Sequence, residues 1–366
     1  MTQKYDEEAR LKEQINLLVQ ALESDSESTR NSVIVQLSLF GAKAVPHLMS
    51  ILTSDLAEEL RLQRHDGAKN SYLELAIDGI IKSLGIIQDE APIELIAKAL
   101  PRKEAVEALA KIGGAKSLDL IINLIAAPLD EFGNQKGGAL RNFLDPDQPS
   151  SPSNDRFVRN VFTCLGEPGR LRLKEELTSA NPRRRAAVAS VARVMKDKES
   201  IVELSVMLKA HDLGEKAEAA RALMELGARE VEPMLVKELY EIERKIEDLE
   251  LSQTREASDL LVYDQLKEAR DAVEMAVLIL GDVDTLVEVG FHPTRRDATK
   301  FSVRPEFRKA IIANGESSVP ALTKFLAVQD KSAQSAAAEI IALIKKHGEG
   351  NDDTLTSDDS LVGGNK

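Results

Sequence analysis

The sequence has no tryptophan, a single cysteine and few aromatic residues, which make up 4% of its 366 residues. One cysteine, Cys164, excludes an internal disulfide and any metal site built from several thiolates. Its apolar neighbours Val161, Phe162 and Leu165 predict that Cys164 is buried as a small apolar side chain. Chemistry that depends on several cysteines is therefore excluded.

Basic residues are fewer than acidic ones, and long apolar runs are missing. Lysine and arginine number 48 against 61 acids, and the formal net charge of −13 disfavours a general attraction to nucleic acid or anionic membrane. No apolar run approaches the roughly 20 residues that cross a bilayer. The start, MTQKYDEEARLKEQ, lacks the apolar segment of a secretory signal. These features predict a cytoplasmic protein with no membrane partner.

Motifs that carry enzymatic chemistry are missing as well. There is no GxxxxGK[ST] phosphate loop, no GxSxG turn, no HExxH and no CxxC. The five histidines are scattered, with no pair at ligand spacing: His47, His65, His211, His292 and His347. We therefore expect a protein that is not an enzyme and that uses no cofactor and no metal ion.

What the sequence does contain is a recurring phrase. FGAKAVPHLMSIL (residues 40–52) returns as NGESSVPALTKFL (residues 314–326). Degraded copies surround Gly85, Gly113, Gly166 and Gly227, and residues 194–208 form a copy without Gly or Pro. Gly ends a helix at little energetic cost because it has no Cβ that clashes at positive φ. Pro suits the first turn of the next helix. The phrase predicts two helices joined by a tight turn, repeated along the chain.

These residues resemble the HEAT-repeat family, whose repeats have Asp and Arg near the start of a first helix, then Gly and a VPxL-like start of the second. STRNSVIVQLSLFGAKAVPHLMSIL (residues 28–52) is the clearest match, and the resemblance covers about residues 11–346. It implies an all-α fold. The expected architecture is a right-handed α-solenoid of stacked antiparallel helix pairs, HEAT- or armadillo-like, in which each pair packs on its neighbours.

The resemblance assigns residues 1–347 to this array, with three departures. Residues 128–156, rich in Pro, Gly, Asn and Asp, predict a loop insertion that is either functional or merely tolerated. Residues 232–280 carry two apolar seams with alternating steps of three and four, which predict a long helical hairpin or one oversized repeat. Residues 288–305 predict a basic insertion, and residues 348–366 predict a disordered acidic tail.

Cations gather at residues 183–198 and 295–309. A shared positive rim would suit an acidic peptide, a neighbouring subunit or nucleic-acid phosphates. Alternatively, arginines at the start of a first helix pair with acids of the adjacent repeat. The candidate partner-binding residues are these cations and two aromatic residues of the loop insertion: Arg183, Arg184, Arg185, Arg295, Arg296, Lys300, Arg304, Phe132 and Phe143.

The main functional prediction is a non-enzymatic protein-binding scaffold or adaptor, because solenoids expose a long surface suited to extended partners. The partner's identity and the oligomeric state stay open. A second interpretation is a nucleic-acid-binding protein with a HEAT-like fold, as in alkylpurine DNA glycosylases. A third is a HEAT-like enzyme, such as a bilin lyase or a deoxyhypusine hydroxylase. The hydroxylases bind two irons through repeated His-Glu pairs, and no His-Glu dipeptide occurs here.

Overall fold

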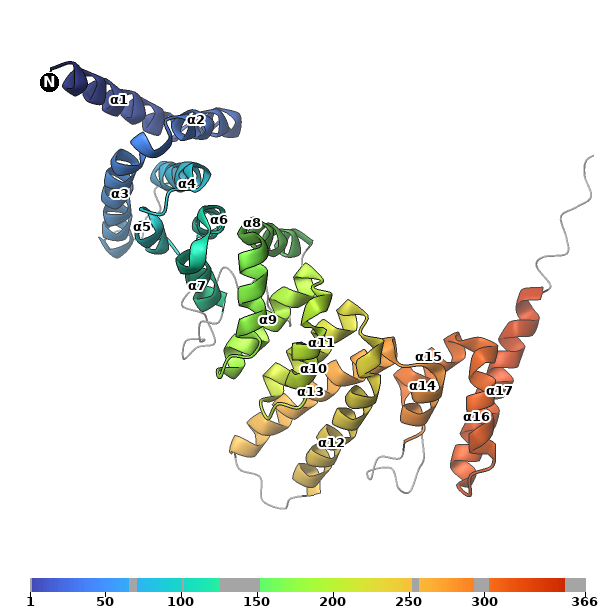
Figure 1. Cartoon of the computed structure of the whole chain (residues 1–366). Coiled ribbons are helices and arrows are strands. Elements are labelled where there is room, and N and C mark those ends of the chain that lie inside the picture. The colour runs from blue at the N-terminus through green and yellow to red at the C-terminus, as the bar shows by residue number, and fades with distance from the viewer. Residues whose placement is uncertain are drawn as a thin grey trace, which may run out of the picture. The chain divides into compact units, whose positions relative to one another are not determined.

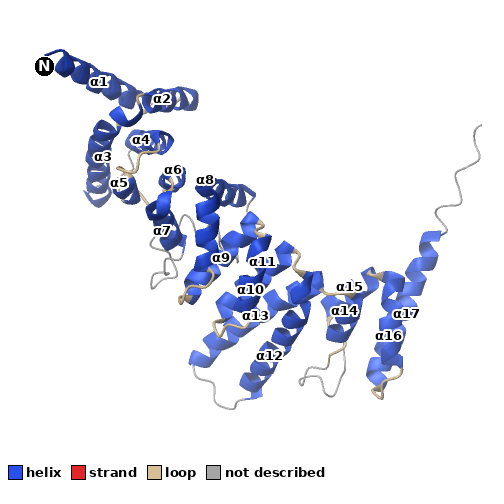
Figure 2. Ribbon diagram, viewed as in Figure 1, coloured by secondary structure: helices blue, strands red, loops and turns tan. Residues whose placement is uncertain are grey.

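The computed structural model describes residues 2–65, 71–100, 102–125, 152–251, 257–292 and 303–352. Within these ranges the chain forms α-helices, numbered α1 to α17, and short 3-10 turns, with no β-strand (Figure 2). The predicted all-α fold is confirmed. In the part of the chain that is described, no helix combines the length and the apolar character needed to span a membrane.

The chain divides into two compact units, Met1–Met195 and Lys196–Lys366. The described helices of the first unit are α1 (Thr2–Ala21), α2 (Glu27–Leu39), α3 (Val45–His65), α4 (Ser71–Ile87), α5 (Ile93–Ala97), α6 (Lys103–Ile112), α7 (Gly114–Ile125), α8 (Pro152–Glu176) and α9 (Pro182–Met195) (Figure 1). Those of the second unit are α10 (Ile201–Met207), α11 (Leu213–Leu226), α12 (Glu232–Leu251), α13 (Ala257–Leu280), α14 (Val283–Gly290), α15 (Pro305–Ala313), α16 (Val319–Leu326) and α17 (Lys331–Asp352).

Helices pack on close neighbours in chain order. In the first unit α2 contacts α4, α4 contacts α6 and α6 contacts α8. In the second unit α11 contacts α13, α13 contacts α15 and α15 contacts α17. Among the described residues, every extensive helix–helix contact joins helices at most three places apart. Within each unit, apolar side chains are therefore buried between successive helices.

Both full copies of the recurring phrase fold into the same turn. Gly41 has φ of 59° and Gly315 has φ of 58°, and each opens a short 3-10 turn that leads into α3 or α16. A Cβ at either position would meet nothing within 4 Å, so the backbone conformation alone explains the glycine. Positive φ recurs at Gly113, Gly114 and Gly227, which lie at helix ends, and at Gly166, where it kinks helix α8. The predicted turn is confirmed at the glycines that lie at helix ends.

Gly85 has a different role from the predicted one. Helix α4 continues through Gly85, and Gln88, with φ of 59°, makes the turn instead. A Cβ on Gly85 would lie 2.7 Å from the Cα of Ala108, so this glycine lets α4 and α6 approach closely. Lys196, with φ of 54°, takes the place of glycine in the copy that lacks one. The turn is thus kept where the glycine is absent.

Short polar side chains cap the starts of helices α2 and α11. Ser26 accepts a hydrogen bond from the backbone N–H of Thr29 at 3.3 Å, and Asp212 accepts one from that of Glu215 at 2.8 Å. The first N–H groups of a helix have no partner within it, so these caps define where α2 and α11 begin.

Residues 232–280 hold two long helices, α12 and α13, which pack side by side (Figure 1). The predicted seam residues are buried on both helices: Leu235, Leu239, Ile242 and Ile246 on α12, and Leu266, Ala269, Val273, Ala276 and Leu280 on α13. Leu249, the last predicted member, is half-buried. The seam therefore weakens toward the end of α12.

Four helices reach into segments that were predicted to lack them. Helix α8 begins at Pro152, inside the predicted loop 128–156. Helix α14 runs to Gly290 and α15 begins at Pro305, both inside the predicted insertion 288–305. Helix α17 runs to Asp352, past the predicted start of the acidic tail. Residues 128–151, 293–302 and 353–366 of these segments lie outside the described residues.

Candidate functional site

Arg184, one of the predicted partner-binding residues, is engaged within the first unit. Its guanidinium, on α9, binds both carboxylate oxygens of Glu176, at 2.8 and 3.0 Å, and contacts the side chain of Asn123. The hydrogen bonds from Arg184 hold the pKa of Glu176 below its usual range. Arg183, by contrast, is exposed and keeps its place as a candidate contact.

Arg185 takes part in a contact that recurs at three helix starts. At each, a side chain in the new helix donates to a backbone carbonyl six residues earlier, in the turn that follows the preceding helix. The three pairs are Arg30 to Ser24 at 2.7 Å, Arg185 to Ser179, and Gln334 to Val328 at 2.6 Å. The contact fastens the turn to the next helix. It gives the arginine at this position a structural use.

Arg304 is also held within the chain. It occupies the residue position just before α15, its side chain is 13% exposed, and it contacts Glu243 of α12 at 2.7 Å and Glu274 of α13 at 3.7 Å. Burial nevertheless raises the pKa of Glu274 above its usual range. Arg304 therefore ties the start of α15 to both helices of the hairpin.

Arg102 makes the same arrangement in the first unit. It occupies the residue position just before α6 and contacts Glu59 of α3 and, at 2.9 Å, Asp78 of α4. In both cases the two carboxylates come from the helices two and three places earlier. We call Arg102 and Arg304 the arginine clamps. Around Arg102, burial and the nearby charge of Glu104 raise the pKa of Asp78 to about 6, more than Arg102 lowers it.

The remaining predicted residues lie outside the described residues and stay predictions: Phe132, Phe143, Arg295, Arg296 and Lys300. Of the predicted cations that are described, Arg184, Arg185 and Arg304 have partners within the chain. Arg183, Arg184 and Arg185 belong to the first unit, and Arg304 belongs to the second.

Two titratable rings of the second unit, those of Tyr240 and His292, lie against each other. Tyr240 stacks on His292 with ring centroids 4.0 Å apart, and burial, with the charge of Glu288, raises the pKa of Tyr240 to about 12. Such a phenol stays protonated near neutral pH and is a poor general base. Across the described ranges, no group of three His, Cys, Asp or Glu residues could hold a metal ion.

The prediction that Cys164 is buried is wrong, because its side chain is exposed. Val161, Phe162 and Leu165 are buried on one face of α8. Cys164 precedes Leu165 by one residue, which rotates it by about 100° around the helix axis and off that face. Apolar neighbours in the sequence were therefore misleading about its position.

The surface that the sequence analysis missed lies at the distal end of the α12–α13 hairpin. Four large apolar side chains are exposed there: Leu251 (68%), Leu260 (52%), Leu261 (63%) and Val262 (42%). The hydroxyl of Tyr263 donates to Glu250 across the hairpin at 2.6 Å, which places the ends of both helices at the same level. We call these four residues the tip patch.

Packing within the hairpin does not account for the tip patch. Val262 lies one turn before the buried Leu266 and continues the seam of α13. Leu261 lies roughly 140° from Leu266 around the helix, and Leu251 lies roughly 140° from Ile246. These two side chains point away from the partner helix. The uninterrupted run Leu260–Val262, which breaks the three-and-four spacing, is the signal that sequence reasoning had available.

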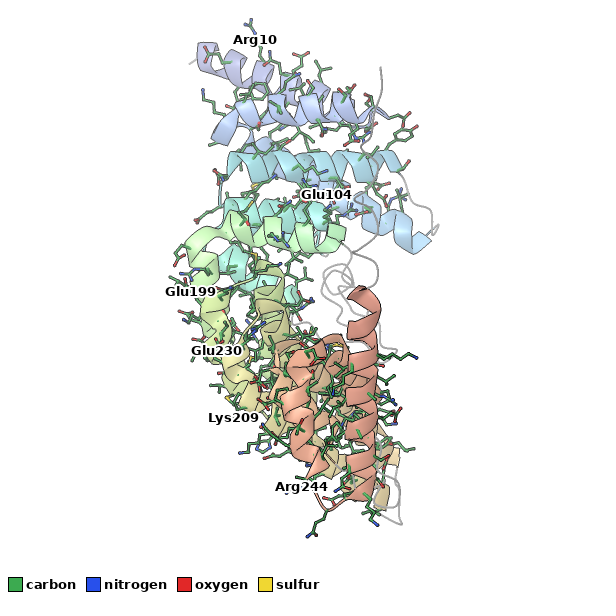
Figure 3. The ribbon with its side chains drawn as sticks, turned by 90° about the vertical axis from the view of Figure 1, so that its right-hand side faces the viewer. Arg10, Glu104, Glu199, Lys209, Glu230 and Arg244 are labelled. Atoms are coloured by element: carbon green, nitrogen blue, oxygen red, sulfur yellow. The ribbon has the colours of Figure 1, made fainter. Side chains whose placement is uncertain are left out.

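The hairpin is also strongly acidic. Residues 232–280 contain thirteen acids and six bases, so they carry a net negative charge out of proportion to their length. Near the tip, Lys267 lies over the ring of Tyr263 at 4.4 Å. On α12 the exposed side chains include Arg244, which extends away from the ribbon (Figure 3), and Lys245. The apolar tip patch therefore stands on a surface that is acidic overall.

No protein-family model matches this sequence, and no curated protein matches it. Among solved structures, it is similar to the crystal structure of an engineered protein from the Northeast Structural Genomics Consortium. The two share 18% sequence identity over 92% of this chain and 96% of that chain, with a TM-score of 0.27. A likeness this low carries no argument about fold or function.

Proposed function

We propose that this protein is a non-enzymatic, cytoplasmic scaffold, built as a right-handed HEAT-like α-solenoid, that holds a protein partner at the tip patch. The observation that carries the proposal is the exposure of Leu251, Leu260, Leu261 and Val262 at one end of the hairpin. Large exposed apolar clusters rimmed by polar residues are typical of interaction sites. Burying one such side chain against a partner contributes roughly 1.5–3 kcal/mol.

The packing pattern supports a solenoid. Within each unit, extensive contacts join helices that are close in chain order, as expected when each repeat leans on the next. The turns at Gly41 and Gly315 recur with the same backbone conformation, as expected of repeated helix pairs. An elongated array of this kind has a large surface for its length, which suits a scaffold.

The nucleic-acid interpretation loses support among the described residues. Arg184 and Arg304 are paired with carboxylates, and Arg185 is bound to a backbone carbonyl. Phosphate binding needs cations that are free to replace counterions. We therefore place protein binding first.

Site-specific photocross-linking tests the proposal. Benzoylphenylalanine is placed at Leu260 in the tip patch or, as a matched control, at Val206 on α10, an exposed apolar position outside the patch. In cytosolic extract we expect a discrete cross-linked partner, identified by mass spectrometry, from position 260 and not from position 206. Equal labelling from both positions, or none from position 260, would contradict the proposed site.

A further inference from the structure

One face of α13 is exposed along most of its length in the second unit. The face consists of side chains spaced by three and four residues: Leu261, Asp264, Glu268, Asp271, Met275 and Ile279. This spacing places them in one row, on the side of the helix away from the seam that packs against other helices. At 1.5 Å per residue the row is about 27 Å long. We call it the outer row.

The outer row has apolar ends and an acidic centre. Leu261 stands at one end, and the exposed Met275 and Ile279 stand at the other. The spacing resembles that of a coiled-coil seam, in which apolar residues at steps of three and four meet a second helix. The length and the spacing both fit a single partner helix of five or so turns.

The acidic centre keeps its negative charge despite two neighbouring arginines. Arg221 contacts Glu268 at 3.2 Å but also contacts Glu218 at 2.5 Å. Each such guanidinium is shared between two carboxylates.

Arg270 behaves in the same way, since it contacts Asp271 at 2.5 Å and Glu274 at 4.0 Å. Asp264 is exposed at the other side of the centre. The two guanidiniums thus contact four carboxylates, of which Glu268 and Asp271 belong to the outer row, and Asp264 adds a further acid to the row.

The charge pattern disfavours a second copy of this chain as the occupant. Two outer rows packed antiparallel about a two-fold axis through Glu268 would place Leu261 against Met275, which is favourable. The same arrangement would place Glu268 against Glu268 and Asp264 near Asp271. Like charges directly opposite each other are destabilising. A cationic segment meets the same row without this penalty.

We infer that the outer row receives an amphipathic helix of a partner protein, with apolar residues at both ends of one face and lysine or arginine between them. The inference rests on the proposed function, because Leu261 belongs to both the tip patch and the outer row. It adds the chemistry of the partner. The apolar ends supply affinity, and the cationic centre supplies orientation and selectivity.

A pair of synthetic peptides tests the inference. Each is an end-capped helix of about 21 residues, long enough to cover the outer row. The first carries Leu at both ends of one face and three Lys between them, and the second carries Glu in place of Lys. Binding to the full chain is measured by fluorescence anisotropy at low and at physiological salt. We expect the Lys peptide to bind at least tenfold more tightly, with a preference that falls as salt rises.

Variants of the chain locate the binding. Met275→Ser should weaken the binding of the Lys peptide by roughly tenfold, since an apolar contact with the peptide is lost. Asp264→Lys should lower the affinity for the Lys peptide several-fold and raise the affinity for the Glu peptide. Glu230→Lys, at an exposed acid in the turn before α12, is the matched control and should change neither.

The outcomes separate this inference from the proposed function. Three results would contradict a cationic partner helix: equal binding of both peptides, no binding of either, or an effect of Glu230→Lys as large as that of Asp264→Lys. A cross-link from position 260 would still support the tip patch in each of these cases. A concentration-dependent dimer in sedimentation equilibrium that Met275→Ser abolishes would replace the partner helix with a second copy. Loss of the cross-link alone would instead refute the tip patch.

Discussion

The starts of the helices and the tip of the hairpin use their side chains in opposite ways. At the helix starts, arginines are paired within the chain: Arg102, Arg184 and Arg304 each bind one or two carboxylates of earlier helices. At the tip, leucines that would ordinarily be buried are exposed. Polar side chains serve the architecture and apolar side chains face outward.

The difference follows from the surroundings of the side chains at the helix starts and at the hairpin tip. A helix start has N–H groups without helical partners, and the preceding turn has carbonyls without them, so charged and polar side chains are useful there. A repeat array also needs contacts that fix each helix on the last two. The tip lies beyond the seam of α12 and α13, and its four apolar side chains are exposed. Exposure of this kind is expected to be kept for a partner.

The largest predicted effect is on the arginine clamps. Arg304→Ala leaves Glu243 and Glu274 partly buried with no clamp between them, and we expect the free energy of unfolding to fall by roughly 2–4 kcal/mol. Arg102→Ala should act similarly through Glu59 and Asp78. Urea denaturation followed by circular dichroism measures both.

The matched control for the clamps is Arg183→Ala. Its exposed side chain should contribute within about 0.5 kcal/mol. A comparable loss for Arg183→Ala and Arg304→Ala would erase the distinction between clamping and solvated arginines.

The next effect concerns Asp78, whose pKa is raised to about 6 from 3.8. A carboxyl with a higher pKa when folded binds its proton more tightly in the folded state. Its contribution to stability is therefore greatest below about pH 4 and is lost as the pH rises to about 6. The shift corresponds to at most about 3 kcal/mol, and roughly 1–2 kcal/mol is expected for a side chain that is 25% exposed.

Asp78→Asn removes this titrating group, so comparing it with wild type shows whether the group's contribution to stability rises or falls with pH. Relative to wild type, the variant should be less stable at pH 4.5 and should gain stability by pH 7.5, as measured by urea denaturation at both pH values. Glu104→Gln should lower the pKa of Asp78, because the charge of Glu104 helps to raise it, and should flatten the same curve. A difference between wild type and Asp78→Asn that does not change with pH would contradict the raised pKa.

A smaller effect is expected where a side chain reaches back six residues. Arg30→Ala removes the hydrogen bond to the carbonyl of Ser24 and should cost about 1 kcal/mol. Arg30→Gln should recover most of it, because Gln334 makes the same contact to Val328 with an amide. Thermal denaturation of the three proteins measures this. Equal losses for the Ala and Gln variants would show that packing of the long Arg side chain, and not the hydrogen bond, matters.

Much of the fold was predictable because the recurring phrase reflects a local requirement of the backbone, the turn between two helices. Gly41 and Gly315 need positive φ, and a glycine at such a position can be recognised in the sequence. Gln88 and Lys196 adopt the same conformation without any such signal. Gly85 carries the signal but serves the close approach of α4 to Ala108. A glycine in the sequence therefore indicates a possible turn, whereas tertiary contacts decide which residue adopts the positive φ.

The site was less predictable, for a physical reason. The sequence shows that cations cluster, but whether Arg184 meets Glu176 depends on how separate helices pack. Exposure of Cys164 and of Leu261 depends on a rotation of about 100° per residue, which apolar neighbours in the sequence do not reveal. The sequence analysis offered the alternative that arginines at helix starts pair with acids of the adjacent repeat, and Arg102, Arg184 and Arg304 do pair with acids of earlier helices. The hairpin tip had a sequence signal only in the run Leu260–Val262.

The smallest predicted effect tests the other side of the comparison. Leu261→Ser replaces an exposed side chain and should change the free energy of unfolding by no more than about 0.5 kcal/mol, mostly through helix propensity. The matched variant Leu266→Ser, one turn and a residue further along α13, buries a hydroxyl in the seam and should cost several times more. Urea denaturation compares them directly. A loss above about 1 kcal/mol for Leu261→Ser would mean that this side chain is already packed within the chain, and an outward-facing leucine would no longer distinguish the tip from the helix starts.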